Sequence, residues 1–170
     1  YDENMLTHTR YSDGSEEWYD EKGRLTHIRY SDDEYEVWRE YDEKGNCIHF
    51  KDSDGCERWY DEKGNVTHTK ASDGYEVWWE YDEEGNETHT RYSDGREVWK
   101  EYDENMLTHT RYSDGREVWW EYDKKGNITH TKSSSGYERW YDEKGNITHY
   151  KDSDGYEVWW EYDEEGNITH

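Results

Sequence analysis

The stretch Tyr141 to Glu161, YDEKGNITHYKDSDGYEVWWE, decides the fold because the rest of the chain repeats it with small changes. Its first two residues, Tyr-Asp, occur nine times in the 170-residue chain, at intervals of roughly 20 residues. A period of this length is typical of a stacked array, in which each unit buries its surface against its neighbours. We therefore expect residues 1–170 to form one continuous array of about eight and a half such units, and to be a fragment of a longer array.

Each unit contains two turn signals. The first is Asp142-Glu143-Lys144-Gly145-Asn146, in which glycine can take the left-handed conformation that closes a three-residue hairpin loop. The second is Ser153-Asp154-Gly155, a candidate for a two-residue type I′ turn. The segments between them, Ile147 to Lys151 and Tyr156 to Tyr162, are rich in β-branched and aromatic residues. The pattern predicts an all-β antiparallel β-hairpin repeat array, a meander of about seventeen strands forming a single coiled or spiralling sheet.

The turns also predict the register of the strands. A three-residue first loop places Tyr141 opposite Ile147, and a two-residue second loop places His149 opposite Trp160. One face of the sheet then carries His149 and Trp160, and the other face carries Trp159. Length differences between units fit this alternation. Three units lack two residues before Tyr-Asp, which preserves the face of every other side chain; these are the units around Trp18, Trp59 and Trp140.

Two further length changes fall inside turns. The segment Glu104 to Leu107 lacks the usual glycine, and the segment Ser31 to Glu34 has one extra residue. Turns tolerate such changes better than strands do, because a one-residue shift within a strand moves its side chains to the other face.

Composition predicts a thin, acidic structure. The chain has thirty aromatic residues against sixteen Ile, Leu, Val and Met residues, so Tyr and Trp must supply most of the buried apolar area. A net charge of −24 would repel phosphate groups, which argues against nucleic acid and anionic membrane surfaces as partners. No apolar run approaches the roughly 18 residues that a membrane-spanning helix needs.

The segment Trp160 to Thr169 closely resembles the YD repeat, also called the RHS (rearrangement hotspot) repeat, with its Tyr-x-Tyr-Asp-x-x-Gly-Asn/Arg-Leu/Ile-Thr core. The Arg-Leu-Thr form of this core occurs at Gly23 to Thr26. The resemblance covers the whole chain. It implies hairpins stacked into a spiralling sheet that serves as a scaffold or shell segment, with neighbouring repeats as partners. It also implies an extracellular or cell-surface location, which the residues themselves leave unknown.

Two other functions remain open. Repeated Trp and Tyr residues on hairpins of this length are similar to choline- and glucan-binding repeats, in which aromatic pockets hold sugars or quaternary amines. In that interpretation, the candidate ligand-binding residues are Trp79, Trp120, Trp160, Tyr81, Tyr122 and Tyr162. In the second alternative, the chain is a self-assembling protein whose open edge strands pair between molecules.

We expect no catalytic residue, metal site or cofactor. Carboxylates recur in every unit, whereas an active site is usually one odd constellation on a scaffold. Nine histidines occupy the same place in successive units, on strands about 9.6 Å apart, which is too far for them to share a zinc ion. We interpret them as structural residues packed beside Trp and Tyr. Cys47 and Cys56 lie far apart in the predicted register, which predicts two free thiols.

Overall fold

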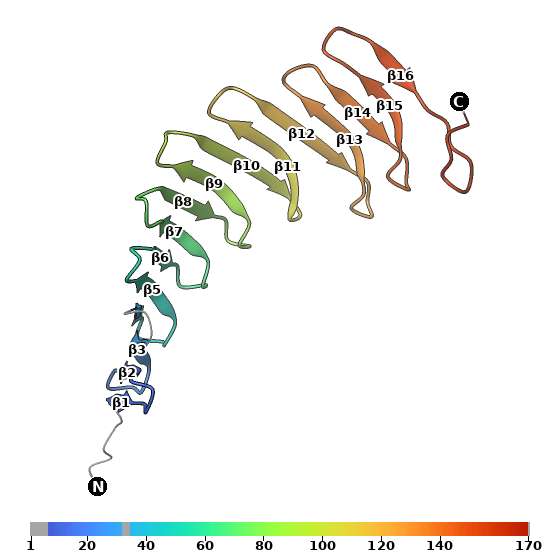
Figure 1. The fold of residues 1–170 in the computed structure, drawn as a ribbon. Helices are drawn as coiled ribbons and strands as arrows, with labels where there is room; N and C mark the ends of the chain where they lie inside the picture. Colours follow the sequence, from blue (N-terminus) through green and yellow to red (C-terminus); the bar gives the residue numbers. More distant parts are fainter. Residues whose placement is uncertain (1–6, 32–34, 170) are drawn as a thin grey trace. The chain divides into compact units, whose positions relative to one another are not determined.

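The computed structural model describes residues 7–31 and 35–169, which form sixteen strands and no helix (Figure 1). Short turns join the strands, and the order of strands in the sheet is their order in the sequence. This architecture confirms the predicted all-β antiparallel hairpin meander. After the last strand, Tyr162 and Ile168 form one isolated antiparallel bridge. The strands are β1 (His8–Arg10), β2 (Glu16–Tyr19), β3 (Leu25–Arg29), β4 (Glu36–Tyr41), β5 (Cys47–Asp52), β6 (Glu57–Tyr60), β7 (Val66–Lys70), β8 (Glu76–Tyr81), β9 (Glu87–Tyr92), β10 (Glu97–Asp103), β11 (Met106–Tyr112), β12 (Glu117–Tyr122), β13 (Ile128–Ser133), β14 (Glu138–Tyr141), β15 (Ile147–Lys151) and β16 (Glu157–Trp159).

The chain forms two compact units. The first extends to Glu80 and includes Tyr92–Asp94, and the second contains Tyr81–Arg91 and the residues from Gly95 onward. Both compact units are built from hairpins of the same kind. The extra turn residue predicted within residues 31–34, the first Tyr-Asp pair and His170 lie outside the described residues. No helix long and apolar enough to cross a membrane occurs in residues 7–31 and 35–169.

Where all residues of the second turn are described, it is a three-residue loop, so the predicted two-residue type I′ turn is wrong. Between β15 and β16, the amide of Asp152 donates to the carbonyl of Tyr156 at 2.9 Å, and Lys151 lies opposite Glu157. A type I′ turn requires positive φ at both central residues, but in this loop only Gly155 has it, at 85°. A loop that confines the left-handed conformation to glycine avoids the strain that an aspartate would carry there.

A β-bulge follows the first turn of each unit. Tyr141 lies opposite Ile147, as predicted, but the next residue in β14, Trp140, lies opposite His149. Thr148 is therefore the extra residue of the bulge. Its hydroxyl donates a hydrogen bond to the carbonyl oxygen of Trp140 at 3.4 Å. This bond gives that carbonyl a partner at the bulge, where the regular pairing is interrupted.

The longer loop and the bulge each shift the register by one residue. His149 consequently lies opposite Trp140 on one side and Trp159 on the other. The prediction that it lies opposite Trp160 is wrong. The physical result is that histidine and the first tryptophan of each unit share one face of the sheet, whereas the predicted register separated them.

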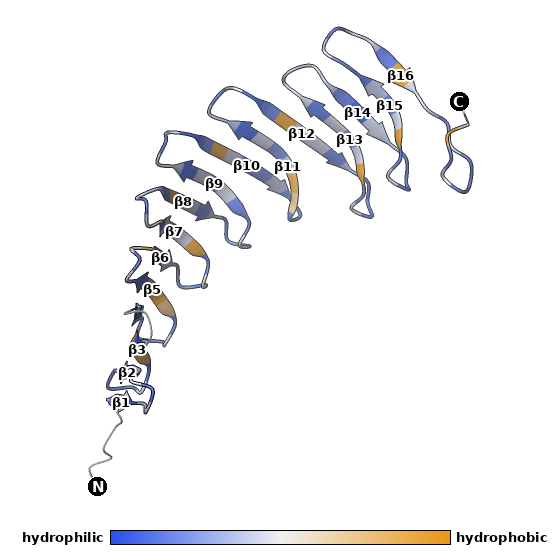
Figure 2. Cartoon of the chain, viewed as in Figure 1, coloured by the Kyte–Doolittle hydropathy of each residue, from blue (hydrophilic) through white to orange (hydrophobic). Residues whose placement is uncertain are grey.

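The opposite face carries a thin core. Ile28 and Val37 lie opposite each other and are the buried hydrophobic residues of the described chain, at 8% and 4% exposure. Thr90 and Thr110, each 2% exposed, occupy equivalent positions in other hairpins. Figure 2 shows apolar residues as isolated bands on mostly hydrophilic strands. Stability therefore depends on contacts between neighbouring strands more than on a deep interior.

The turn without glycine has the two-residue form. Asp103 pairs with Met106, and the two residues between them have positive φ, 48° for Glu104 and 66° for Asn105. This is the geometry that a type I′ turn needs. The length change therefore falls inside a turn, as predicted.

Candidate functional site

Histidine and tryptophan rings stack on one face of the sheet. In β13 to β16 the ring centroids of His130, Trp140, His149 and Trp159 follow one another at 4.6, 4.2 and 4.6 Å. A His–Trp stack of this kind spans every hairpin closed by the second type of turn, at His8–Trp18, His27–Trp38, His49–Trp59, His68–Trp78, His89–Trp99, His109–Trp119, His130–Trp140 and His149–Trp159. The histidines therefore pack beside tryptophan, as expected from the sequence.

Each of these histidines also contacts a glutamate on the following strand. The Nε2 atom of His109 lies 2.8 Å from Oε2 of Glu117, and the same pairing recurs in the other hairpins at 2.6 to 3.2 Å. In His109 and His130 the second ring nitrogen, Nδ1, faces another carboxylate, from Glu101 at 3.5 Å and Glu121 at 3.4 Å. These imidazoles are thus fixed between two carboxylates.

The hairpins with two additional residues interrupt the ring stack. In the short hairpin of β14 and β15, Trp140 is covered by histidine on both sides. In the long hairpin of β12 and β13, Trp119 stacks on His109 on one side only, with centroids 5.0 Å apart. On its other side Trp119 lies opposite Lys132. The two-residue extension therefore leaves one indole face without an imidazole partner.

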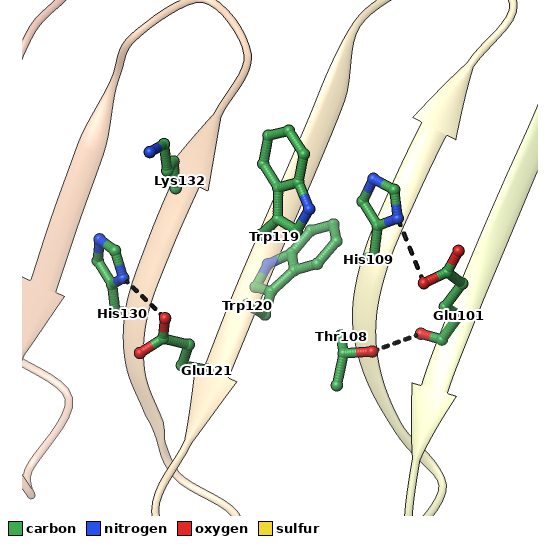
Figure 3. A pocket seen from close by; sticks show the side chains of 8 residues that line it. All are labelled: Glu101, Thr108, His109, Trp119, Trp120, Glu121, His130 and Lys132. Atoms are coloured by element: carbon green, nitrogen blue, oxygen red, sulfur yellow. Dashed lines mark hydrogen bonds and ion pairs between the residues drawn. The ribbon is translucent and has the colours of Figure 1, made fainter.

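A pocket of about 530 Å³ lies at this interruption (Figure 3). Figure 3 shows the His109–Glu101 and His130–Glu121 pairs on either side of the tryptophans. The carboxylates are open to solvent, since the side chains of Glu101 and Glu121 are 74% and 71% exposed, whereas His130 is 16% exposed. The lining residues are Glu101, Thr108, His109, Trp119, Trp120, Glu121, His130 and Lys132.

A second pocket, in the compact unit that extends to Glu80, is lined by the same side-chain types, namely tryptophan, glutamate, histidine and lysine. It has a volume of about 390 Å³ and is lined by Trp38, Glu40, His49 and Lys51. Trp38 lies opposite Lys51, and Glu40 lies opposite His49. This pattern matches Trp119, Glu121, His130 and Lys132 of the first pocket position by position, so the pocket accompanies long hairpins with lysine opposite the first tryptophan.

A third long hairpin shows the closed form of the same arrangement. In β10 and β11, Trp99 lies opposite Arg111 in place of lysine. The guanidinium carbon of Arg111 lies over the Trp99 ring, 4.5 Å from its centroid. A planar cation therefore occupies the indole face that the two lysine-containing hairpins leave open.

Of the six predicted ligand-binding residues, Trp120 lines the larger pocket. The hydroxyls of Tyr122 and Tyr162 donate to backbone carbonyls of the preceding unit, Leu107 and Ile147, each at 2.8 Å. Burial raises the pKa of Tyr122. These two tyrosines thus join neighbouring units. The remaining three, Trp79, Tyr81 and Trp160, are half-buried and are not among the residues that line the two pockets described above.

The sequence prediction missed the residues that form the pockets, above all Trp119, His130 and Lys132. The signal was present in the two-residue difference between units. It was interpreted as neutral because it preserves side-chain faces, although it also changes which residue lies opposite each tryptophan.

Both cysteines are free thiols, as predicted. Within the described residues, no group of three or more His, Cys, Asp and Glu side chains is placed to hold a metal ion.

The chain is similar in sequence or in fold to several known proteins. The family model described as RHS Repeat matches residues 60–97. Among solved structures, TcdB2-TccC3 without its hypervariable C-terminal region is 15% identical with a TM-score of 0.50, over 95% of this chain and 11% of that chain. A structure of the Photorhabdus luminescens Tc holotoxin pore is 14% identical with a TM-score of 0.48, over 91% of this chain and 10% of that chain. A comparison with curated proteins gave no match.

This chain spans about a tenth of the length of those two structures. At 15% identity, the likeness to TcdB2-TccC3 concerns the fold alone. The family match covers one full unit of the array, from Tyr60 to Glu80, and most of the next, up to Glu97 at the start of β10. The match agrees with the resemblance seen in the sequence: residues 60–97 of this chain are similar to an RHS repeat.

Proposed function

We propose that the chain is a non-enzymatic structural segment, a scaffold or part of a shell, that stacks with further repeats of its own kind. The observation that carries this proposal is the recurrence of one contact set in successive hairpins. The same His–Trp stack and His–Glu pair appear from β1 to β16, and three-residue loops close most of the hairpins. A group engaged in the same sheet contact in every unit serves the stacking of units.

The RHS match and the Tc toxin structures support this function at the level of fold. We infer that the partners of this chain are adjacent repeats, as the stacking of its own hairpins implies. The organisation of residues 1–170 as one array of about eight and a half units remains a prediction.

The last strand offers a direct test of stacking. Trp159 in β16 is 59% exposed, whereas Trp140 has a histidine ring on each side. Fusing a copy of residues 150–170 after His170 continues the repeat and supplies a new Ile-type strand next to β16. In a linear array the free energy of unfolding rises with each added unit and its interface, so the midpoint of urea unfolding should increase.

The matched control is a fusion of the same residues in scrambled order. The repeat fusion should also protect the amides of β16 from hydrogen exchange, and the scrambled fusion should not. Equal midpoints and equal exchange in the two fusions would contradict the proposal, because a unit that gains nothing from its neighbour is not part of a stacked array.

A further inference from the structure

Two of the second turns are candidate sites of covalent modification. We propose that Asp54-Gly55 and Asp154-Gly155 undergo spontaneous isomerisation of aspartate to isoaspartate, which the same dipeptide resists in other turns of the chain. The proposal concerns the chemistry of single turns and does not depend on the stacking of repeats. The dipeptide Asp-Gly occurs six times, and all six aspartates are exposed: Asp13, Asp54, Asp73, Asp94, Asp114 and Asp154.

The reaction needs only the aspartate, the glycine after it and water. The amide nitrogen of Gly155 forms a bond to Cγ of Asp154, and the carboxyl hydroxyl leaves with the amide proton as water, which closes a succinimide ring. Glycine favours this step because it has no Cβ to hinder the approach. Water then opens the ring. Addition at the main-chain carbonyl carbon of Asp154 releases a free α-carboxyl group and routes the main chain through Cβ and Cγ, whereas addition at Cγ restores aspartate.

Two conditions control ring closure in a folded turn. The carboxyl must be protonated, because an ionised carboxylate has no hydroxyl that can leave as water. The side chain must also rotate until Cγ approaches the glycine nitrogen. A hydrogen bond from a backbone amide opposes both, since it stabilises the ionised form and fixes the side chain. The rate should therefore depend on whether the aspartate before glycine accepts such a bond.

Three of the six carboxylates accept the amide of the residue after glycine. The Ser15 hydroxyl and amide hold the pKa of Asp13 below its usual value. The Arg116 amide and guanidinium do the same for the pKa of Asp114. These carboxylates are thus fixed in their ionised form. The amide bonds run from Ser15 to Asp13 at 2.9 Å, from Tyr75 to Asp73 at 2.9 Å and from Arg116 to Asp114 at 3.0 Å.

An additional aspartate accepts this amide in the two proposed sites. Tyr156 donates its amide to Oδ1 of Asp152 at 2.9 Å. The turn at residues 52–56 has the same contact, also at 2.9 Å. Within the described residues, the carboxylates of Asp54 and Asp154 have no hydrogen-bond or ion-pair partner. The first aspartate of each turn therefore leaves the second one free to rotate toward glycine.

The chain contains a matched pair of these turns. Residues 70–86 and 151–167 have the same sequence except at one position, where the first segment has Ala71 and the second has Asp152. The local sequence after each Asp-Gly is identical, so on sequence alone Asp73 and Asp154 should react at the same rate. The structure indicates unequal rates, because only the Asp73 carboxylate accepts the amide of the tyrosine that follows glycine.

Isomerisation at Asp154 would alter a contact between neighbouring turns. Isoaspartate adds one methylene group to the main chain of a loop that the amide of Asp152 closes on the carbonyl of Tyr156 at 2.9 Å. Ser153 lies in the same loop, and a Cβ added at Gly136 would be 3.1 Å from its Cα. The modification therefore falls where two turns touch. Its product carries a free α-carboxyl group, which is the substrate of an isoaspartyl carboxyl methyltransferase.

The test is incubation of the folded chain at physiological temperature and neutral pH, followed by tryptic peptide mapping in which isoaspartate and aspartate are distinguished by mass spectrometry. Asp154 should isomerise at least about fivefold faster than Asp73, the factor expected from one hydrogen bond. In urea the two rates should agree within about twofold, because the matched sequences then lack the loop contacts.

Three variants test the cause. Asp152→Ala should lower the rate at Asp154 by about fivefold, and Ala71→Asp should raise the rate at Asp73 by about the same factor. Asp152→Asn keeps an acceptor oxygen for the Tyr156 amide, so it is the matched control and should leave the rate at Asp154 unchanged. The proposal is overturned if Asp154 and Asp73 react within about twofold of each other in the folded chain, or if Asp152→Ala leaves the rate at Asp154 unchanged. A difference that persists in urea would equally overturn it, since the sequence rather than the folded turn would then determine the rate.

Discussion

Replacing Gly136 and Gly155 by alanine tests whether neighbouring turns contact each other as the structure shows. Both glycines close the same kind of three-residue loop, with φ of 92° and 85°. A Cβ added at Gly155 meets no atom within 4 Å, whereas a Cβ added at Gly136 lies 3.1 Å from the Cα of Ser153. The two substitutions share the same backbone strain and differ in the contact with the next turn.

The magnitudes follow from these two terms. A left-handed conformation costs about 1–2 kcal/mol in a residue with a Cβ, and alanine offsets about 0.4–1 kcal/mol of this by restricting the unfolded chain. Gly155→Ala should therefore lower the free energy of unfolding by about 1 kcal/mol. At Gly136 the backbone of Ser153 must also move, and such overpacking adds about 1–3 kcal/mol. Gly136→Ala should cost about 2–4 kcal/mol in total.

Urea unfolding followed by circular dichroism measures both variants against the parent protein. The comparison is valid if the dependence on urea, the m-value, is the same in all three. If the two variants lose the same free energy of unfolding to within about 0.3 kcal/mol, the reasoning is refuted, because the extra contact at Gly136 would then have no measurable cost. In that case the turns at residues 133–137 and 152–156 would not be in contact in solution.

Three further predictions concern single side chains. Tyr122→Phe removes a hydrogen bond between units and should lower the free energy of unfolding by about 1 kcal/mol in urea, whereas Tyr156→Phe, at a side chain with 65% exposure, should have no effect. Hydrogen bonds from Asn146 hold the pKa of Asp142 below its usual value of 3.8, so its stabilising contribution is present above that pH and is lost as the pH falls below it. Asp142→Asn keeps the acceptor oxygen without titrating, so thermal melts should show a smaller loss of stability between about pH 5 and pH 3 than in the parent; an unchanged acid profile would contradict this. Burial raises the pKa of Cys47, so iodoacetamide should alkylate this thiol more slowly in the folded chain than in urea, and equal rates would show that it is not buried.

The fold could be predicted from the sequence because the residue types themselves mark where turns and strands occur. Glycine at a fixed offset in Asp-x-x-Gly and Asp-Gly marks a turn wherever the chain needs positive φ, and aromatic and β-branched segments mark the strands between turns. The type of the second turn is harder to predict from the sequence. Asp154-Gly155 fits both a type I′ turn and a three-residue loop, and the choice depends on whether aspartate or only glycine takes positive φ.

The candidate site could not be predicted, because it depends on the bulge. Nothing in Ile-Thr-His requires Thr148 to lack a partner residue in β14, and its hydroxyl contact with Trp140 becomes visible only in three dimensions. Without the bulge and the longer loop, histidine and the first tryptophan fall on opposite faces of the sheet. The sequence predicts an aromatic surface at the second tryptophan of a unit, such as Trp160, whereas the described pockets lie beside the first tryptophan, such as Trp119.

The two-residue extension of the long hairpins changes the surface around the first tryptophan and keeps the contacts that stabilise the sheet. Adding two residues to a strand keeps its alternation, so loops, bulge and backbone pairing are the same in short and long hairpins. What changes is the partner of the first tryptophan, which is His149 for Trp140 but Lys132 for Trp119. Once that partner is no longer a stacking imidazole, a single side chain determines whether the indole is open, with lysine, or covered, with arginine. In this chain the surface chemistry of a hairpin can therefore change by one residue without disturbing the contacts that stack the array.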